Sequence, residues 1–199
     1  MDKKADAEQL KSACQGVAAT VKQVERKDKS EKPPALYDLT TLQRDANRLL
    51  GYTAQQTLDY LQNLYEKKLC TYPRADSRYL TSDMAEGLPV LVNLVANAVP
   101  FRKGIAISCN AAAVINDKKV TDHHAVIPTR NIREADLSAL PVGERAILEL
   151  VALRLLCAVA QPYTFAETAV VVECAGAEFT AKGRTVKQPG WRALDAAYR

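Results

Sequence analysis

The sequence lacks the features that mark several large classes of protein. Glycine occurs only 8 times in 199 residues, with no Gly-rich phosphate-binding loop and no Gly-x-Ser-x-Gly motif. The five cysteines are scattered without any C-x-x-C spacing, so neither a zinc ribbon nor a disulfide framework is indicated. We therefore expect a reducing, cytoplasmic compartment. No apolar run reaches the roughly 18 residues of a membrane span, and the first residues form no apolar signal segment, so we expect no membrane partner.

What remains is the composition of an ordinary globular protein. Hydrophobic residues make up 48% of the chain and charged residues 25%, which suits one large domain or two small ones. The net charge of +4 is compatible with a polyanionic partner but is weak evidence by itself.

Hydrophobic periodicity predicts a helical centre between strands. Helical spacing of apolar residues occurs in residues 4–14, 39–50, 53–65, 82–98 and 143–160. Alternating patterns predict strands at residues 17–27, 165–174 and 177–182, and the charged stretch KSEKPP (29–34) predicts a linker. Because a lone strand is unstable unless it is paired, we expect strand 17–27 to pair antiparallel with residues 165–182. The fold class is therefore α+β.

Details at two helix ends sharpen this prediction. Gly51 is expected to end the helix that begins at Leu39, and Thr53 with Gln56 fits a capping box for the next helix. A helix–glycine–helix joint resembles a helix-turn-helix, although an ordinary helical hairpin is at least equally common on spacing alone.

Tyr72 is the first candidate for chemistry. A phenol is a poor nucleophile unless a base removes its proton or a cation stabilises the phenolate. Arg74 and Arg78 follow in the polar loop 70–80, Pro73 restricts the backbone between Tyr72 and Arg74, and guanidinium groups bind phosphate oxygens well. Attack on a phosphodiester would need such an arrangement. For Tyr-Pro-Arg alone, a surface tyrosine beside solvated arginines is the commoner case.

The second candidate is the sequence Asp122-His123-His124, which holds the only two histidines of the chain. Paired histidines in a polar loop can bind metal, shuttle protons or bind phosphate. No further ligands at recognisable spacing accompany them, so we predict no metal site. A loop histidine satisfied by its neighbours is again the commonest case for this motif alone.

Two longer stretches together carry a more specific signal. The segment LYDLTTLQRDANRLLGYTAQQTLDYLQNLYEKKLCTYPRADSRYL (36–80) resembles the active-site segment of type IA DNA topoisomerases, above all topoisomerase III, and TDHHAVIPT (121–129) resembles that family's second motif. The closing pair Gly190-Trp191 also fits, and the resemblance runs roughly from residue 5 to 195.

The resemblance implies roles for individual residues. Tyr72 would attack single-stranded DNA and form a 5′-phosphotyrosine, Arg74 would contact the scissile phosphate, and His123 would lie near that phosphate. Strand passage and religation would need no ATP. Further DNA contacts are expected from four residues: Gln43, Arg44, Arg78 and His124.

The resemblance also implies a domain organisation. The gate-forming arch would comprise a helix and a strand from residues 1–35 and the returning strands from residues 161–199. Between them, residues 36–160 would form a winged-helix-like domain that bears the tyrosine. The family's Toprim domain, whose acidic residues bind Mg²⁺, is not recognisable here. We therefore expect no cofactor in this fragment and Mg²⁺ in the Toprim domain of the full-length enzyme. The expected partners are the remaining domains of the same polypeptide. The fragment alone is expected to have little activity. Ala75 departs from the usual Thr or Ser, which puts full activity in mild doubt.

Two other interpretations compete with this one. A non-catalytic winged-helix DNA-binding module, with Tyr72 structural, would account for the helix–glycine–helix joint and the positive charge. A tyrosine recombinase is disfavoured by order, because that family places its arginine and histidine motifs before a late tyrosine, whereas Tyr72 precedes His123.

Overall fold

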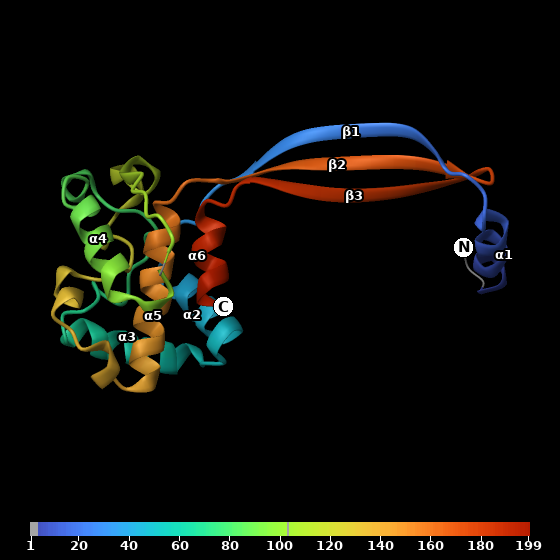
Figure 1. Cartoon of the computed structure of the whole chain (residues 1–199). Coiled ribbons are helices and arrows are strands. Elements are labelled where there is room, and N and C mark those ends of the chain that lie inside the picture. Colours follow the sequence, from blue (N-terminus) through green and yellow to red (C-terminus); the bar gives the residue numbers. More distant parts are fainter. Residues whose placement is uncertain (1–3, 103) are drawn as a thin grey trace. The chain divides into compact units, whose positions relative to one another are not determined.

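The computed structural model describes residues 4–102 and 104–199 and divides the chain into two compact units (Figure 1). One unit, the sheet unit, combines Met1–Glu31 with Thr164–Gln188, and the other, the helical unit, combines Lys32–Tyr163 with Pro189–Arg199. The chain thus leaves the sheet unit, builds the helical unit and returns. The predicted α+β class is confirmed, since the described residues form six α-helices and a three-stranded sheet.

The sheet unit contains helix α1 (Lys4–Cys14) and a sheet of strand order β1-β2-β3. Strand β1 is Thr20–Glu31, β2 is Tyr163–Cys174 and β3 is Ala177–Gln188. Strands β2 and β3 form an antiparallel hairpin whose register runs from Cys174↔Ala177 to Thr164↔Gln188. Two ion pairs join β1 to β2, Lys22–Glu173 at 2.7 Å and Lys29–Glu167 at 2.6 Å, and their opposite sequence order fits an antiparallel neighbour. The predicted pairing of the two ends of the chain is confirmed.

The strands are longer than predicted. Strand β1 begins at Thr20 and continues to Glu31, so the prediction of a linker from residue 29 was wrong for its first residues. Strand β3 likewise runs on to Gln188 instead of ending at 182. Most side chains of β1 and β3 are exposed, so their ends carry no apolar alternation. Charge pairs stabilise these ends instead, such as Lys187–Asp28 at 2.5 Å.

Local capping explains the first two helices of the helical unit, α2 (Leu39–Leu50) and α3 (Ala54–Glu66). Gly51 ends α2 in the left-handed conformation, with φ at 73°. Thr53 and Gln56 form the predicted capping box: the Thr53 hydroxyl accepts from the Gln56 amide at 3.1 Å, and the Gln56 side chain accepts from the Thr53 amide at 2.9 Å. The end of α2 and the start of α3 therefore lie where the sequence places its caps.

Three further helices complete the helical unit: α4 (Leu88–Ala98), α5 (Val142–Ala158) and α6 (Trp191–Tyr198). The predicted helix at 82–98 is divided, because a 3₁₀ turn at Ser82–Met84 precedes α4 and Pro89 lies in the first turn of α4. Residues 189–199, expected among the returning strands, instead lie in the helical unit, where α6 packs against α5.

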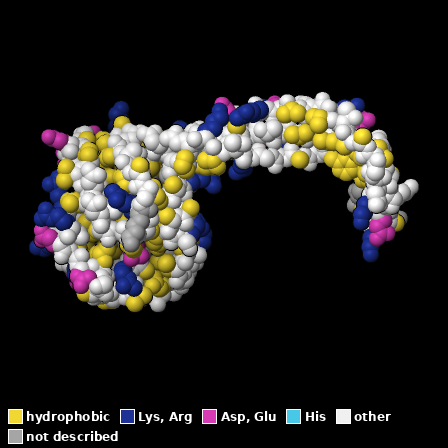
Figure 2. Space-filling view, viewed as in Figure 1, with side chains coloured by type: hydrophobic (Ala, Val, Ile, Leu, Met, Phe, Trp, Pro, Cys, Tyr) yellow, Lys and Arg dark blue, Asp and Glu magenta, His cyan; other side chains and the backbone are white. Residues whose placement is uncertain are grey.

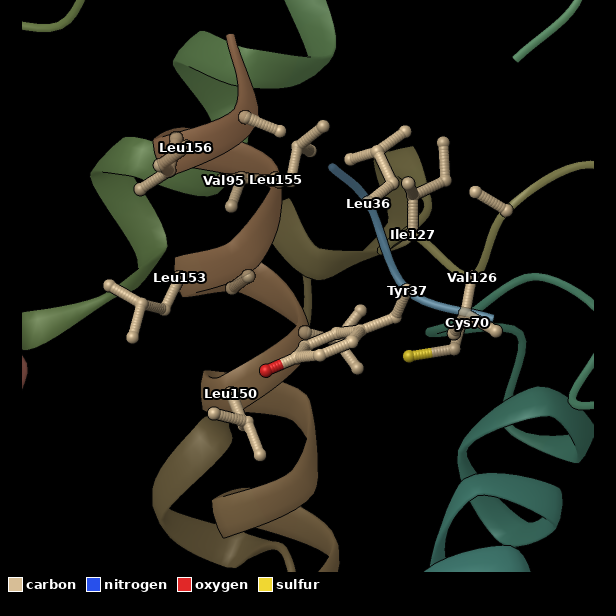
Figure 3. Packing of buried hydrophobic residues seen from close by; sticks show 14 of the residues in the cluster. Leu36, Tyr37, Cys70, Val95, Val126, Ile127, Leu150, Leu153, Leu155 and Leu156 are labelled. Atoms are coloured by element: carbon tan, nitrogen blue, oxygen red, sulfur yellow. The ribbon is translucent and has the colours of Figure 1, made fainter. Parts of the chain in front are cut away.

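The core of the helical unit surrounds α5, which is buried along most of its length, as predicted from its apolar composition. Helix α5 packs against α2, α3, α4 and α6. Figure 3 shows the ring of Tyr37 extending toward Leu150 of α5, with Cys70, Val126 and Ile127 close to Tyr37. This packing fixes the loops that carry the two sequence motifs.

Candidate active site

Hydrogen bonds hold the segment that precedes Tyr72 against the end of the second motif. The amide of Thr71 donates to the carbonyl of Ile127 at 3.0 Å, and the Thr71 hydroxyl donates to the Ala125 carbonyl at 3.2 Å and accepts from the Ile127 amide at 3.0 Å. An isolated antiparallel bridge between Cys70 and Pro128 extends the contact. Because the two segments run antiparallel, residues after Thr71 lie beside residues before Ala125, and Tyr72 meets His123.

The rings of Tyr72 and His123 are in contact. Their centroids lie 4.1 Å apart with 38° between the planes, and both side chains are partly exposed. On its other side Tyr72 meets Tyr65 of α3 edge-on, with the centroids 5.6 Å apart and the planes at 86°. An edge-to-face pair at this distance is a favourable aromatic geometry.

Tyr65 is a site residue that the sequence did not reveal. Its helical spacing with Leu61 and Leu64 suggested an inward-facing position. In the structure Leu61 and Leu64 are fully buried, whereas the Tyr65 side chain is 40% exposed and lies against Tyr72. The only signal in the sequence was its place in the last turn of α3, just before the loop.

Arg74 is exposed, and its guanidinium has no hydrogen-bond or ion-pair partner among residues 4–102 and 104–199. It is therefore free to meet a ligand, although the structure does not bring it into the ring contact between Tyr72 and His123. The next residue, Ala75, is 3% exposed and belongs to the hydrophobic core. The methyl group of Ala75 thus faces the protein interior, and its carbonyl accepts from the Leu39 amide at 3.1 Å.

The histidines have different surroundings. The Nε2 atom of His123 lies 3.5 Å from Oδ2 of the exposed Asp122, and Nδ1 of His124 lies 2.8 Å from the carbonyl oxygen of Ala125. His124 is therefore oriented by the backbone, while His123 offers its ring to Tyr72.

The other three predicted DNA contacts lie outside this aromatic cluster. Gln43 uses its amide group to donate to the carbonyl of Ala54 at 3.0 Å, which ties α2 to α3. Arg44 is exposed on α2. Nε of Arg78 donates to the Leu36 carbonyl at 3.0 Å, and Arg44 and Arg78 line one cavity.

No group of three or more His, Cys, Asp or Glu side chains in the described part of the chain is placed to hold a metal ion. None of the helices among the described residues is long and apolar enough to cross a lipid bilayer.

Comparison with known proteins identifies the family of the chain. The sequence model of the DNA topoisomerase family matches residues 1–199. The DNA topoisomerase 3 of Bacillus licheniformis is 41% identical over 194 residues, covering 94% of this chain and 26% of that protein. The DNA topoisomerase 3 of Bacillus subtilis is 42% identical over 188 residues, covering 90% and 25%. The solved structure of full-length topoisomerase I from Thermotoga maritima matches with a TM-score of 0.72 at 22% identity, over 95% of this chain and 31% of that one, which shows a shared fold.

The chain therefore belongs to the DNA topoisomerase family, and within it to the type IA enzymes. Its curated relatives assign it to the topoisomerase III kind. It spans about a quarter of the length of these relatives.

Proposed function

We propose that Tyr72 is the nucleophile of an ATP-independent strand-passage reaction on single-stranded DNA in the full-length cytoplasmic enzyme. The Tyr72 oxygen forms a bond to phosphorus while the bond to the 3′ oxygen breaks. The products are a 5′-phosphotyrosine and a free 3′-hydroxyl, which takes up the proton that the phenol loses. Religation is the reverse step, so the energy of the phosphodiester is retained and no ATP is needed.

One observation carries the proposal: the contact between Tyr72 and His123, which joins two motifs distant in sequence. A scissile phosphate beside Tyr72 would lie within reach of the imidazole of His123. The guanidinium of Arg74, two residues along the chain, is exposed and has no partner among residues 4–102 and 104–199. Both groups donate hydrogen bonds to the charge that develops on the phosphate oxygens. Gln43, Arg44, Arg78 and His124 are proposed to contact the rest of the strand.

The isolated chain is proposed to relax no supercoiled DNA. Mg²⁺ binding, and the surface that would complete the site around the phosphate, are assigned to the Toprim domain of the full-length enzyme. A relaxation assay with the purified chain and Mg²⁺ tests this point. Robust relaxation that is lost in Tyr72→Phe would refute it.

The nucleophile is tested in the full-length enzyme with a single-stranded oligonucleotide labelled at its 3′ end. The label should become covalently attached to the protein and survive denaturation. Tyr72→Phe should abolish this adduct, whereas Tyr79→Phe, a tyrosine of the same loop whose hydroxyl accepts from Lys119 at 3.4 Å, should retain it. An adduct that persists in Tyr72→Phe would show that another residue is the nucleophile. No adduct with the unaltered enzyme would favour the alternative, a DNA-binding module in which Tyr72 is structural.

A further inference from the structure

Four arginines gather around one carboxylate on the surface of the helical unit. A cavity of about 330 Å³ is lined by Thr41, Arg44, Asp45, Arg48, Arg78 and Arg154. A second cavity of about 340 Å³ shares Asp45, Arg48 and Arg154 with the first. Figure 2 shows Lys and Arg side chains as scattered patches on the visible face of this unit. The four arginines are distinguished because they line one cavity together.

Asp45 is fully occupied by its partners. It accepts from Nη2 of Arg48 at 2.9 Å, from the hydroxyl of Tyr37 at 2.8 Å and from Nη2 of Arg154. Burial alone would raise the pKa of Asp45, but the hydrogen bonds from Arg48 and Tyr37 and the charge of Arg154 outweigh it, so the pKa lies below its ordinary value. Asp45 is therefore ionised at neutral pH and neutralises one arginine's worth of charge.

The lining of the first cavity carries four guanidinium groups and one carboxylate. A second carboxylate, that of Asp195, lines the second cavity and offsets part of the charge of Arg48, but it does not line the first cavity. Neither Arg44 nor Arg78 has a carboxylate partner in the part of the chain that the structure describes. Arg48 and Arg154 both form ion pairs with Asp45, so a structural role accounts for them. It does not account for Arg44 and Arg78, whose positive charges lie beside the other two and repel them. A bound anion would remove that repulsion.

Two of the four guanidinium groups are fixed in advance. Arg154 donates to the Tyr37 hydroxyl at 2.9 Å and lies over the Tyr37 ring, with 4.1 Å from its guanidinium carbon to the ring centroid. Arg78 is held by the Leu36 carbonyl. Arg44 and Arg48 are exposed on successive turns of α2. Arg48 pairs with Asp45, whereas Arg44 has no partner among the described residues and can adjust to a ligand. Such a set suits a phosphate group, whose oxygens accept paired hydrogen bonds from guanidinium forks.

We propose that this arginine cluster binds a backbone phosphate of the DNA strand that is cleaved at Tyr72. Arg78 belongs to the same loop as Tyr72, six residues further along the chain. The inference rests on the proposed function for the identity of the strand. The cluster positions DNA and takes no part in bond cleavage.

The test measures binding of a fluorescent oligothymidylate to the 199-residue chain by anisotropy at several salt concentrations. The double variant Arg44→Gln/Arg78→Gln should bind at least 10-fold more weakly at low salt, and its logarithmic salt dependence should be shallower by about 0.7 for each phosphate that the protein no longer neutralises. The control is Arg133→Gln, an exposed arginine paired with Glu134, which should bind like the unaltered chain. Circular dichroism melting checks that all variants fold.

The outcomes separate this proposal from the proposed function. A double variant that binds DNA as tightly as Arg133→Gln overturns the phosphate site, whatever the adduct assay gives. In another outcome, inorganic phosphate competes with the oligothymidylate for the unaltered chain while the double variant loses no DNA binding. That result also overturns the phosphate site. Weak DNA binding by the double variant together with an intact adduct in full-length Tyr72→Phe supports the phosphate site and refutes Tyr72 as nucleophile.

Discussion

Tyr72 and His123 lie ring against ring, with 4.1 Å between their centroids, although they come from separate loops. The contact depends on the hydrogen bonds that tie Thr71 to Ala125 and Ile127, not on either motif alone. This contact provides what the proposed function requires, a phenol and a hydrogen-bond donor side by side, so that one phosphate could meet both.

His123→Ala in the full-length enzyme should slow formation of the covalent adduct roughly 10²-fold, the typical cost of removing one preorganised donor. Binding of the uncleaved oligonucleotide should change much less, because the imidazole is proposed to act mainly in the transition state. Rapid-quench measurement of adduct formation, beside an anisotropy titration, separates the two effects. His124→Ala is the comparison, since His124 is oriented by the Ala125 carbonyl and is proposed to contact the rest of the strand. Its loss should weaken binding and leave the cleavage rate of the bound strand nearly unchanged. Equal losses of affinity and of cleavage rate in His123→Ala would contradict the assignment.

Tyr65→Leu in the full-length enzyme should slow adduct formation about 2- to 10-fold, which corresponds to the roughly 0.5–1.5 kcal/mol of an edge-to-face aromatic pair. The physical reason is that Tyr65 limits the orientations of the Tyr72 ring. Tyr65→Phe keeps the ring and should restore the rate. If Tyr65→Phe were as slow as Tyr65→Leu, the hydroxyl and not the ring contact would be responsible.

The sequence predicted those parts of the molecule that local chemistry determines. The capping box at Thr53 and the stop at Gly51 follow from a few neighbouring residues, and the burial of α5 follows from its apolar composition. The ends of β1 and β3 could not be found in this way, because exposed strands carry no apolar alternation and depend on partners such as Glu167, far along the chain.

The candidate site shows the same division. Tyr72, Arg74 and His123 were found through motif resemblance, because no local pattern requires residues of two loops to meet. Tyr65 was missed because helical spacing assigns its side chain to the core. The loop that follows α3 brings the Tyr72 ring against the Tyr65 ring, and this course cannot be derived from helical spacing. Arg44 and Arg78 of the arginine cluster were predicted to contact DNA, and this stays a prediction. Their neighbours Arg48 on α2 and Arg154 on α5 were not singled out in the sequence.

Asp45→Asn should destabilise the helical unit by about 1–3 kcal/mol at neutral pH, since Arg154 loses its counter-charge while it stays mostly covered. The folded-state pKa of Asp45 is lowered, so its contribution is fully present above the ordinary value of about 3.9 and is lost as pH falls from there through the folded-state pKa. Urea denaturation of the 199-residue chain at pH 7 and in steps below pH 4 measures this. The difference between the two proteins should shrink on acidification, and a constant difference would rule out the ionised carboxylate as its source.

Gly190→Ala tests the backbone conformation of Gly190 at the start of α6. Gly190 has a φ of 48°, and the following amide, that of Trp191, donates to the Gln161 carbonyl at 2.9 Å. A methyl group on Gly190 would lie 2.3 Å from the Pro162 carbonyl oxygen and 2.4 Å from that of Gln161. Because both obstacles are backbone atoms, the chain must shift and the attachment of α6 to α5 must loosen.

We expect a loss of about 2 kcal/mol or more in the free energy of unfolding for Gly190→Ala. The matched control is Gly51→Ala, since Gly51 has a φ of 73° but no atom within 4 Å of an added methyl group. It should lose only about 1 kcal/mol, the cost of the left-handed backbone alone. Urea denaturation of the 199-residue chain, followed through the fluorescence of its single tryptophan, Trp191, measures both losses and reports directly on α6. Equal losses in the two variants would mean that the close approach to residues 161 and 162 contributes nothing, and that Gly190 is needed only for its backbone conformation.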